Sequence, residues 1–471
     1  MNDRQPHELD GPAIGRPPSQ SAKRVIVVGA GLAGLTAAAE LVQAGYAVTV
    51  LEGQLRPGGR VRTLREPFAD GLHAEIGASR ILDCHQRVLD YARALGLQLI
   101  PFFPEEGDGI DYLRGSAVRV NRNQAPELAA YPLALQPAEQ RLSVAEAGQL
   151  VFGPLLATGG EPRDPAWPLG RLHALDQADV EDMLRSRGLS AAVAEALTLG
   201  FRERDGLDIS LLYVLRQFAL EHEHKRVLKI AGGNDHLPRA LAARLASNIS
   251  YGCQVVAIDA GPAQVRVQYR ESGVLSTLSA DRAVCTLPLP VLRGIEVTPA
   301  LSPDKMRAVQ EVRYGSAARI LLQVRRRSWR DQGLSGFART DMPAELWDPS
   351  YEQPGSRGLL QAYFRLGAAE KVRALDREAR LAFAVAHMEQ VFPGLKAQVE
   401  GGECFCWHDD PWSRGAVAVP LRGQAALLPA TARAEGRVHF AGEHTSPWAG
   451  WMEGAIESGQ RAATEILRAG S

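Results

Sequence analysis

The chain has 471 residues, of which 45% are hydrophobic and 23% are charged, and its formal net charge is -1 at pH 7. This composition is ordinary for a globular protein, and the length exceeds what one hydrophobic core usually supports, so we expect two or three domains. The near-zero net charge argues against nucleic acid or an anionic membrane surface as a partner.

Residues 1–22 are polar and contain several prolines, without the apolar stretch of a signal peptide, and they predict a disordered tail. No run of about 18 uninterrupted apolar residues follows, so we expect no membrane-spanning helix. The five cysteines are scattered, and their odd number favours a reducing compartment. Cys404 and Cys406 would share one strand face, but no second pair completes a metal site. We therefore expect a cytoplasmic protein without a bound metal.

The first predicted elements form a βαβ unit. Residues 23–28 are a short apolar run, typical of a buried parallel strand. Residues 32–44 carry apolar side chains at helical spacing, and residues 47–51 predict a second strand. This order is typical of nucleotide-binding α/β domains.

Glycines occupy the first turn of this unit, in the sequence Gly29-Ala30-Gly31-Leu32-Ala33-Gly34. Gly29 permits a tight turn, and Gly31 lets backbone N–H groups approach a pyrophosphate. Gly34 lets the helix pack close to the sheet. Glu52 follows about 20 residues later, where a carboxylate accepts hydrogen bonds from a ribose. Together these residues predict a dinucleotide-binding site.

The rest of the chain alternates between helical and sheet-forming segments. Residues 125–225 are rich in Leu, Ala and Glu and predict a group of helices, one of them starting after the capping sequence Asp176 to Asp179 and running through Leu184. The remaining predicted elements are a helix at 237–246, strands at 253–258, 264–269, 275–279, 282–287, 319–324 and 359–364, and a long helix at 376–391. A discontinuous dinucleotide domain interrupted by inserted segments fits this order.

Two further motifs resemble signatures of the flavin amine oxidase superfamily. The segment from Glu52 to Thr63, with Gly58-Gly59-Arg60 inside it, closely resembles its flavin-binding signature. Phe440-Ala441-Gly442-Glu443, together with the segment from Gly450 to Ala455, resembles its C-terminal signature. The resemblance covers nearly the whole chain beyond residue 23 and implies that the protein binds FAD.

The resemblance also implies the fold class, which is α/β. It implies a discontinuous, Rossmann-like FAD-binding domain similar to that of glutathione reductase, with an inserted α+β substrate domain and a helical subdomain. We expect the FAD-binding domain to comprise residues 23–83, 226–287 and 434–471. We expect the substrate-binding domain to comprise residues 84–124 and 288–433, and the helical subdomain residues 125–225.

Residues that would hold the cofactor follow from the same resemblance. Glu52 would bind the ribose, Arg60 would neutralise the pyrophosphate, and Glu443 would meet ribitol or phosphate hydroxyls. The helix after Trp451 would point its N-terminus at the flavin, and the backbone of Val255 would hold the adenine. The full set of expected contacts is Gly29, Gly31, Leu32, Ala33, Gly34, Glu52, Gly53, Gly59, Arg60, Gly77, Ala78, Ser79, Arg80, Val255, Gly442, Glu443, Gly450, Trp451, Met452 and Ala455.

Within the superfamily, the chain is most similar to L-amino-acid oxidases. Residues 74–81 resemble the segment that carries their substrate-carboxylate arginine, here Arg80, and Tyr363 falls where they place a tyrosine that binds the same carboxylate. A guanidinium fork suits a planar carboxylate. Gly450 matches a backbone carbonyl that receives the substrate amine, and Trp451 a wall beside the flavin. These matches imply oxidative deamination of an L-α-amino acid, with O2 as electron acceptor and hydrogen peroxide as a product.

At three positions the residue differs from the one that other members of the superfamily carry. Ala416 stands where some relatives carry a cysteine joined to the flavin, so we expect noncovalent FAD. Val417 stands where amine oxidases place a cage tyrosine. Arg319 stands where superfamily oxidases usually place a lysine near flavin N5. Because a guanidinium keeps its proton and is bulkier than an ammonium, slow reaction with O2 or a different electron acceptor becomes an alternative, unless Arg319 points to solvent.

Other functions and roles stay open at this point. The substrate could be an amine without a carboxylate, with Arg80 in a salt bridge or a cofactor contact, or the protein could be a flavin-binding scaffold with little turnover. The sequence does not fix the oligomeric state, for which a homodimer is one option. His222 and His224 neighbour Glu221 and Glu223, as in a solvated helix end, and predict no catalytic base. Candidate pocket aromatics, each with core packing as the alternative, are Phe218, Trp347 and Trp448.

Overall fold

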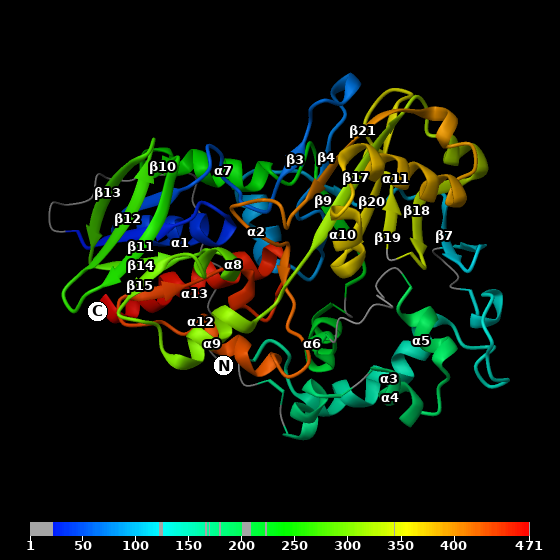
Figure 1. Cartoon of the computed structure of the whole chain (residues 1–471), viewed down its shortest axis with the longest axis horizontal. Coiled ribbons are helices and arrows are strands. Elements are labelled where there is room, and N and C mark those ends of the chain that lie inside the picture. The colour runs from blue at the N-terminus through cyan, green and yellow to red at the C-terminus, as the bar shows by residue number, and fades with distance from the viewer. Residues whose placement is uncertain are drawn as a thin grey trace.

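The computed structural model describes residues 22–121, 126–164, 167–168, 170–178, 180–199, 209–221, 224–342 and 344–470. The predicted tail lies outside this part of the chain, apart from its last residue. The described residues form three regions: a nucleotide-binding α/β unit, a second unit around a large sheet, and a group of helices beside both (Figure 1).

The predicted βαβ unit is confirmed and consists of β1 (Arg24–Val28), α1 (Leu32–Gln43) and β2 (Ala47–Glu52). These strands belong to a parallel sheet of order β10-β2-β1-β14-β23. Its other strands are β10 (Ile249–Tyr251), β14 (Arg282–Cys285) and β23 (Val438–Phe440). The sheet therefore unites segments that lie far apart in the sequence, as the discontinuous α/β fold class requires.

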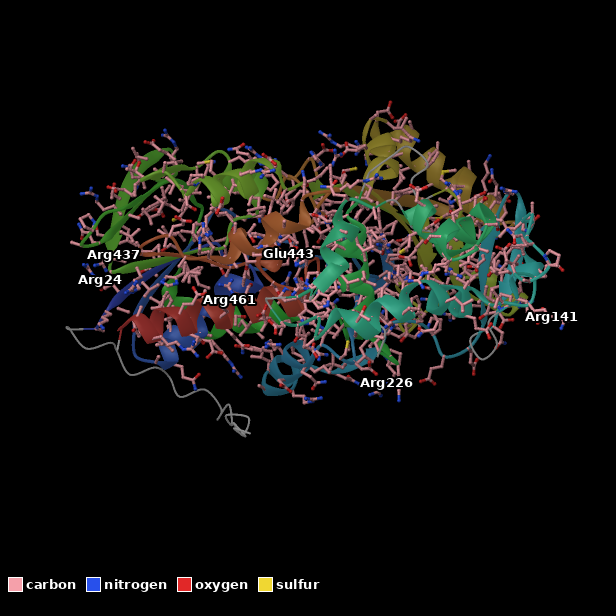
Figure 2. All side chains as sticks on the ribbon, turned by 90° about the horizontal axis from the view of Figure 1, so that it is seen from below. Arg24, Arg141, Arg226, Arg437, Glu443 and Arg461 are labelled. Carbon is pink, nitrogen blue, oxygen red and sulfur yellow. The ribbon has the colours of Figure 1, made fainter. Side chains whose placement is uncertain are left out.

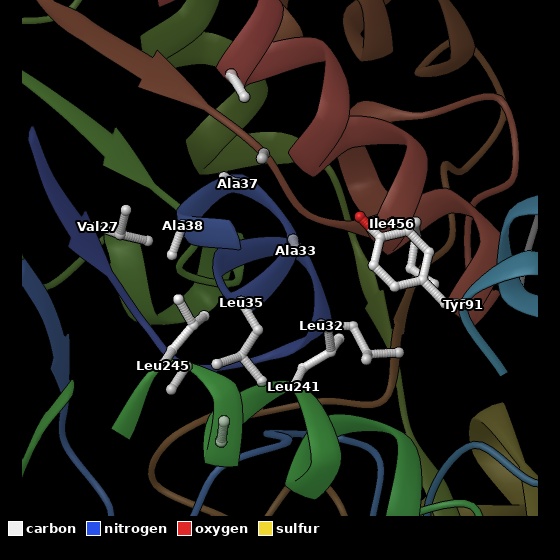
Figure 3. Packing of buried hydrophobic residues seen from close by; sticks show 14 of the residues in the cluster. Val27, Leu32, Ala33, Leu35, Ala37, Ala38, Tyr91, Leu241, Leu245 and Ile456 are labelled. Atoms are coloured by element: carbon white, nitrogen blue, oxygen red, sulfur yellow. The ribbon is translucent and has the colours of Figure 1, made fainter. Parts of the chain in front are cut away.

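Helix α1 packs between two other helices, α7 (His236–Arg244) and α13 (Met452–Gly470). Figure 3 shows Leu35 directed toward Leu241, while Ala33 and Ala37 lie on the side of α13. Small side chains allow the backbones of α1 and α13 to approach closely. A Cβ atom at Gly459 of α13 would collide with the carbonyl oxygen of Ala33.

The strands predicted at 253–258, 264–269 and 275–279 are also confirmed, as part of a four-stranded sheet of order β13-β12-β11-β15. Strands β11 (Cys253–Ala260), β12 (Val265–Glu271) and β13 (Val274–Ala280) are antiparallel neighbours, and β15 (Glu296–Thr298) runs parallel to β11. Three short helices pack on the same core: α8 (Leu289–Leu292), α9 (Pro303–Glu311) and α12 (Leu428–Ala432).

The second unit is built on a seven-stranded sheet of order β21-β17-β20-β19-β18-β7-β8. Its strands are β7 (Asp108–Leu113), β8 (Ser116–Val120), β17 (Ala317–Val324), β18 (Leu334–Thr340), β19 (Ala344–Trp347), β20 (Gly358–Arg365) and β21 (Val399–Cys406). Helices α10 (Leu366–Arg373) and α11 (Arg377–Val391) lie beside it (Figure 1). Asp376 caps α11 by accepting a hydrogen bond from the Ala379 amide at 2.8 Å. The predicted strands and long helix are thus confirmed.

Helices dominate the third region, as expected. They are α3 (Val144–Gly159), α4 (Val180–Ser186), α5 (Ala191–Leu197) and α6 (Leu211–Glu221). Ser143 and Glu146 form a reciprocal capping box at the start of α3. The predicted cap residue Asp179 lies outside the described residues. Short strands join the regions: β3 (Thr63–Leu64), β4 (Ala74–Glu75), β5 (Ile81–Leu82), β6 (Leu99–Pro101), β9 (Val227–Ile230), β16 (Tyr314–Gly315) and β22 (Val417–Ala418).

Helix α2 (Gln86–Ala94) lies within residues 84–124, which we expected to belong to the substrate-binding domain. It packs instead on the nucleotide-binding unit. Val88, Leu89 and Tyr91 lie in the same core as Leu35 and Ile456, on the nucleotide-binding side. Helices α8 and α9 also pack on that side. The division of the chain into domains therefore stays a proposal, in which parts of 84–124 and 288–433 support the nucleotide-binding unit.

Two further expectations concern a bound metal and a membrane-spanning helix. All five cysteines are unbridged. Among the described residues, no cluster of three or more histidine, cysteine or acidic side chains is arranged to hold a metal ion. Nor does any helix in the described ranges combine the length and apolar character that crossing a bilayer would require.

The close approach of α1 and α13 predicts a strong effect of one added methyl group. Gly459→Ala should lower the free energy of unfolding by about 1–3 kcal/mol, because the new Cβ would meet backbone that cannot yield. Thermal or urea unfolding measures this loss. Gly401→Ala is the matched control, because a Cβ there meets nothing within 4 Å. Equal stability of the two variants would contradict the packing described.

A buried histidine at the start of α2 predicts a pH dependence of stability. His85 is inaccessible to solvent, and burial lowers its pKa to about 3, further lowered by His224. Because the unfolded chain binds a proton near pH 6.5 and the folded chain does not, stability present at neutral pH is lost as the pH falls. Between pH 6.5 and 5 we expect His85 to account for about 2 kcal/mol of this loss.

The difference in unfolding free energy between the unaltered protein and His85→Gln isolates this effect. The difference should shrink from pH 7 to pH 5 and stay constant above pH 7, where histidine is neutral in both states. Parallel pH curves over the whole range would show that His85 is not held in its neutral form.

Candidate functional site

A cavity of about 1490 Å³ extends from the first glycine turn, past the large sheet, to the helical region. It is lined by every residue predicted for the site except Gly34. Gly34 instead allows α1 to pack closely against the glycine turn, since a Cβ there would collide with the carbonyl oxygen of Gly29. The structure thus brings together residues from both ends of the sequence, as the motifs predicted.

At one end of the cavity, the glycine turn and Glu52 form a cradle. Gly29 has a φ of +103°, which favours glycine, and a Cβ at Gly31 would meet nothing within 4 Å. No side chain caps the N-terminus of α1, so its backbone amides stay available for an anion. Glu52 accepts hydrogen bonds from the amides of Ala30 (2.7 Å) and Gln54 (2.8 Å), and burial raises its pKa. These features fit the dinucleotide part of a flavin cofactor.

Arg60 and Glu443, predicted to contact the cofactor separately, contact each other. Nη1 of Arg60 lies 2.7 Å from Oε1 of Glu443 and also donates to the carbonyl of Ala416. Glu443 further accepts from the Tyr314 hydroxyl (3.2 Å) and the Gly450 amide (2.8 Å). Burial opposes ionisation of Glu443, but Arg60 outweighs it and holds the pKa below its usual value. Glu443, labelled near the middle of Figure 2, is buried, and its ion pair with Arg60 joins the two signatures.

The opposite wall of the cavity is one face of the seven-stranded sheet. Direct cross-strand neighbours form a row of Arg319, Tyr363, Glu345, Arg339 and Asp111, on β17, β20, β19, β18 and β7. Since such neighbours point to the same face, this face carries both cationic and anionic side chains. Arg365 lies two residues beyond Tyr363 and so shares that face. Arg319, Tyr363 and Arg365 line the cavity.

Arg80 reaches this wall from the segment after β4. Its Nη1 atom lies 3.1 Å from Oε2 of Glu345, and its Cζ atom lies 5.1 Å from the ring centroids of Phe102 and Trp347 and 5.6 Å from that of Phe103. Nε and Nη2 are buried without an acceptor. Arg80 therefore lines the cavity but has its guanidinium enclosed by rings and paired with a carboxylate.

Arg319 is buried, which rules out the alternative that it points to solvent. Its Nη2 atom donates to the carbonyl of Gly77 at 3.1 Å, and its Cζ atom lies 3.7 Å from the ring centroid of Tyr363. Burial lowers its pKa to about 10, and the nearby cations Arg80 and Arg365 lower it further. It still carries its proton at neutral pH, so a fixed positive charge faces the cavity.

Trp451 lies at the start of α13, on the side of the cavity formed by α6. Its Nε1 donates to Oε1 of Glu221 at 2.9 Å, and its ring meets the edge of His85 at 4.8 Å between centroids. Glu221 lines the cavity, and burial raises its pKa. The expectation that Glu221 belongs to a solvated helix end is thus wrong. His224 approaches the backbone carbonyl of Glu221, whereas His222 and Glu223 lie outside the described residues.

The candidate aromatics take different roles. Phe218 lines the cavity, Trp347 packs against Arg80 and Arg319, and Trp448 is buried against His85. Ala416 and Val417 both line the cavity. An aliphatic and a small residue therefore occupy the positions where a cage tyrosine and a flavin-linked cysteine would stand.

Sequence reasoning missed Arg365, Glu345 and Glu221. The first two are charged residues on strands, where alternation alone does not separate a cavity face from a solvated face. A usable signal was that Arg319 and Glu345 interrupt apolar runs in their strands and that Arg365 ends one. Glu221 lies at a helix end, where an acidic residue is ordinary.

Known proteins are similar to this chain in sequence or in fold. YobN of Bacillus subtilis (strain 168), provisionally named an L-amino-acid oxidase, is 31% identical, covering 96% of each chain. The L-amino-acid oxidase of Gloydius blomhoffii is 29% identical over 95% of this chain and 89% of its own. Cyclohexylamine oxidase from Brevibacterium oxydans IH-35A has a TM-score of 0.81 at 23% identity, covering 95% of this chain and 99% of its own. Putrescine oxidase bound to putrescine has a TM-score of 0.80 at 20% identity, with the same coverage.

The solved structures confirm the α/β fold class with its sheets and helices. The family model of flavin-containing amine oxidoreductases matches residues 32–467, nearly the whole chain. Taken with the glycine cradle, the paired signatures and the cavity between them, this match shows that the chain belongs to the flavin-containing amine oxidoreductase family.

Proposed function

We propose that this protein binds FAD noncovalently and oxidatively deaminates an L-α-amino acid. The products would be a 2-oxo acid and ammonia, with O2 as electron acceptor and hydrogen peroxide formed from it. The observation that carries this proposal is the cationic wall of Arg80, Arg319 and Arg365 beside Tyr363, which suits a carboxylate. The names of the bacterial and snake relatives support the same substrate class.

Noncovalent attachment rests on the residue at 416. Alanine has no nucleophile that could bond the flavin, and Ala416 lines the cavity near Arg60, which donates to its carbonyl. The glycine cradle and the uncapped N-terminus of α1 would hold the pyrophosphate. When bound, the flavin would take a hydride from the substrate α-carbon and pass the two electrons to the acceptor.

The protein would contribute position and charge. The carboxylate would meet the cationic wall, and the Gly450 carbonyl would accept a hydrogen bond from the neutral amine. Trp451, held by Glu221 and His85, would close the cavity against water. The α-carbon would then have one orientation, and no separate acid or base is needed for the hydride to leave. Water would hydrolyse the imino acid that results.

A second candidate substrate is an amine without a carboxylate. It is favoured by the pairing of Arg80 with Glu345, since a guanidinium already bound to a carboxylate has less need of a substrate anion. The cyclohexylamine and putrescine oxidases share this fold, although at 23% and 20% identity their likeness concerns the fold alone.

Anaerobic mixing of the yellow protein with a panel of L-amino acids, D-amino acids and simple amines tests the function. We expect L-amino acids to bleach the yellow absorbance of the oxidised flavin, and the amines to leave it unchanged. Bleaching by amines alone would favour the second candidate. Bleaching by no compound would leave a flavin-binding protein with little turnover.

Replacing Arg319 tests the charge beside the proposed flavin. Arg319→Lys should speed the return of flavin absorbance in air by on the order of tenfold, because a compact ammonium keeps the charge and leaves room for O2. Stopped-flow mixing of the reduced protein with air-saturated buffer measures the rate. Arg357→Lys, at an exposed ion pair before β20, is the matched control. Equal reoxidation rates in Arg319→Lys and the unaltered protein would show that the guanidinium does not limit reaction with O2.

A further inference from the structure

Helix α6 forms one wall of the cavity and presents both apolar and polar side chains to it. Phe218 lies against Phe152 of α3, with 5.0 Å between the ring centroids, and both rings line the cavity. Gln217 and Glu221, one helical turn apart, add two polar groups to the same face. The α6 residues that line the cavity are Tyr213, Val214, Gln217, Phe218 and Glu221. Polar groups on such a wall need partners, from the protein or from a ligand.

Glu221 keeps one carboxylate oxygen free of the protein. Its Oε1 atom accepts a hydrogen bond from Nε1 of Trp451 at 2.9 Å, whereas no donor among the described residues binds Oε2. The other cavity-lining carboxylates in the described ranges have both oxygens bound within the protein: Glu52, Asp410 and Glu443. Glu221 is therefore the acidic side chain of the cavity that is open to a ligand.

Gln217 adds a second acceptor beside Glu221. Its Nε2 atom donates to the carbonyl of Pro447 at 3.1 Å, which leaves Oε1 as the other end of the amide. Oε1 is buried, and no donor in the described part of the chain reaches it. Because a buried acceptor without a donor is costly, the two side chains together indicate a ligand that brings N–H groups.

The proposed function fixes where a substrate side chain would point. Three of the four groups on the α-carbon have places: the carboxylate at the cationic wall, the hydrogen at the flavin, and the amine at the Gly450 carbonyl. The side chain then faces the helical region, where α6 closes the cavity. Its stem would lie along Phe152 and Phe218, since methylene groups pack on apolar surface, and its far end would reach Glu221.

The charges around Glu221 suit a cation at that end. Burial raises the pKa of Glu221, and the hydrogen bond from Trp451 and the nearby cations offset this only in part. A cation bound at Oε2 would favour the ionised carboxylate. Arg80 and Arg365 belong to the cationic wall, but both pair with Glu345, which partly neutralises them.

We propose that Glu221, with Gln217 beside it, binds the cationic end of the substrate side chain, so that the substrates are L-α-amino acids with a basic side chain, such as L-lysine or L-arginine. This rests on the proposed function, because the places of the carboxylate and the amine set the direction of the side chain. An apolar side chain would leave both acceptors without donors. A site built in this way discriminates strongly against an analogue that lacks the donor.

The test compares L-lysine with L-norleucine, which has the same carbon stem but no terminal ammonium. In the flavin-loaded, unaltered protein, kcat/KM should be higher for L-lysine by at least about 100-fold. Glu221→Gln removes the charge but can still accept from Trp451. It should lower kcat/KM for L-lysine by about 10- to 100-fold and leave that for L-norleucine within a few-fold.

Two further variants sharpen the comparison. Gln217→Met keeps the size of the side chain and removes its acceptor. It should lower kcat/KM for L-lysine by less than Glu221→Gln does, because a neutral acceptor contributes less than a charged one. Glu378→Gln, on the exposed face of α11, is the matched control and should leave both substrates unchanged.

The outcomes separate this proposal from the proposed function. Equal losses for L-lysine and L-norleucine in Glu221→Gln would place Glu221 at the part that both substrates share, and would overturn the assignment. A preference of the unaltered protein for L-norleucine would also overturn it, although turnover of an L-amino acid would still uphold the function. Oxidation of simple amines but of neither amino acid would overturn both.

A second carboxylate variant covers a failure of Glu221→Gln to fold or to retain flavin. Glu221→Asp keeps the charge but withdraws it by one methylene group. The ratio of kcat/KM for L-lysine to that for L-norleucine should then fall, because the ammonium no longer reaches its partner. An unchanged ratio would overturn the proposal.

Discussion

The buried carboxylate of Glu345 is the constraint on which the substrate side of this protein depends. An ionised group inside a protein needs close partners of opposite charge, because removing either partner leaves an uncompensated charge at a cost of about 3–5 kcal/mol. Arg365 and Arg80 supply those partners from a strand end and from a distant loop. Their positions are therefore coupled, and neither segment can shift without disturbing the other. A rigid wall of this kind suits a site in which the reacting carbon must be held in one orientation.

The cofactor side relies on a similar pairing between remote segments. Arg60 follows β2 near the start of the chain, and Glu443 follows β23 near its end, yet they share a buried ion pair. The parallel sheet brings these ends together because β1 lies between β2 and β14, and β14 lies beside β23. The cavity therefore forms only after the chain has closed on itself. Both of its ends carry hydrogen-bond donors: backbone amides at the glycine turn, and guanidinium groups at the large sheet.

Local patterns in the sequence predicted much of this structure. The glycine turn, the βαβ unit, the strands at 264–269 and 275–279 and the long helix at 376–391 depend on residues close in sequence, and all were found. Every site residue that the resemblance supplied, apart from Gly34, lines the cavity. The role of Glu345 could not be predicted, because its partners are set by the register between β19 and β20. The packing of α2 could not be predicted either, because its apolar face does not specify which of the two units it packs on.

For Arg319, the sequence predicted the position on the strand but not the contacts of the side chain. Sequence comparison gave its place on the strand correctly, and the structure adds that its guanidinium is stacked on Tyr363 and bound to Gly77. This stacking joins the two groups expected to serve flavin and substrate. A change at either one would therefore alter the setting of the other, so single substitutions here will not act independently.

The charged row across the large sheet reaches beyond the cavity. Its last member, Asp111, accepts from Arg339 and also from the Tyr131 hydroxyl at 2.6 Å. Tyr131 belongs to the segment that leads into the helices, so a continuous chain of polar contacts runs from that outer segment to the strand beside Glu345. A substitution at Tyr131 would therefore alter the support of the cavity wall from behind, because neither Tyr131 nor Asp111 itself lines the cavity.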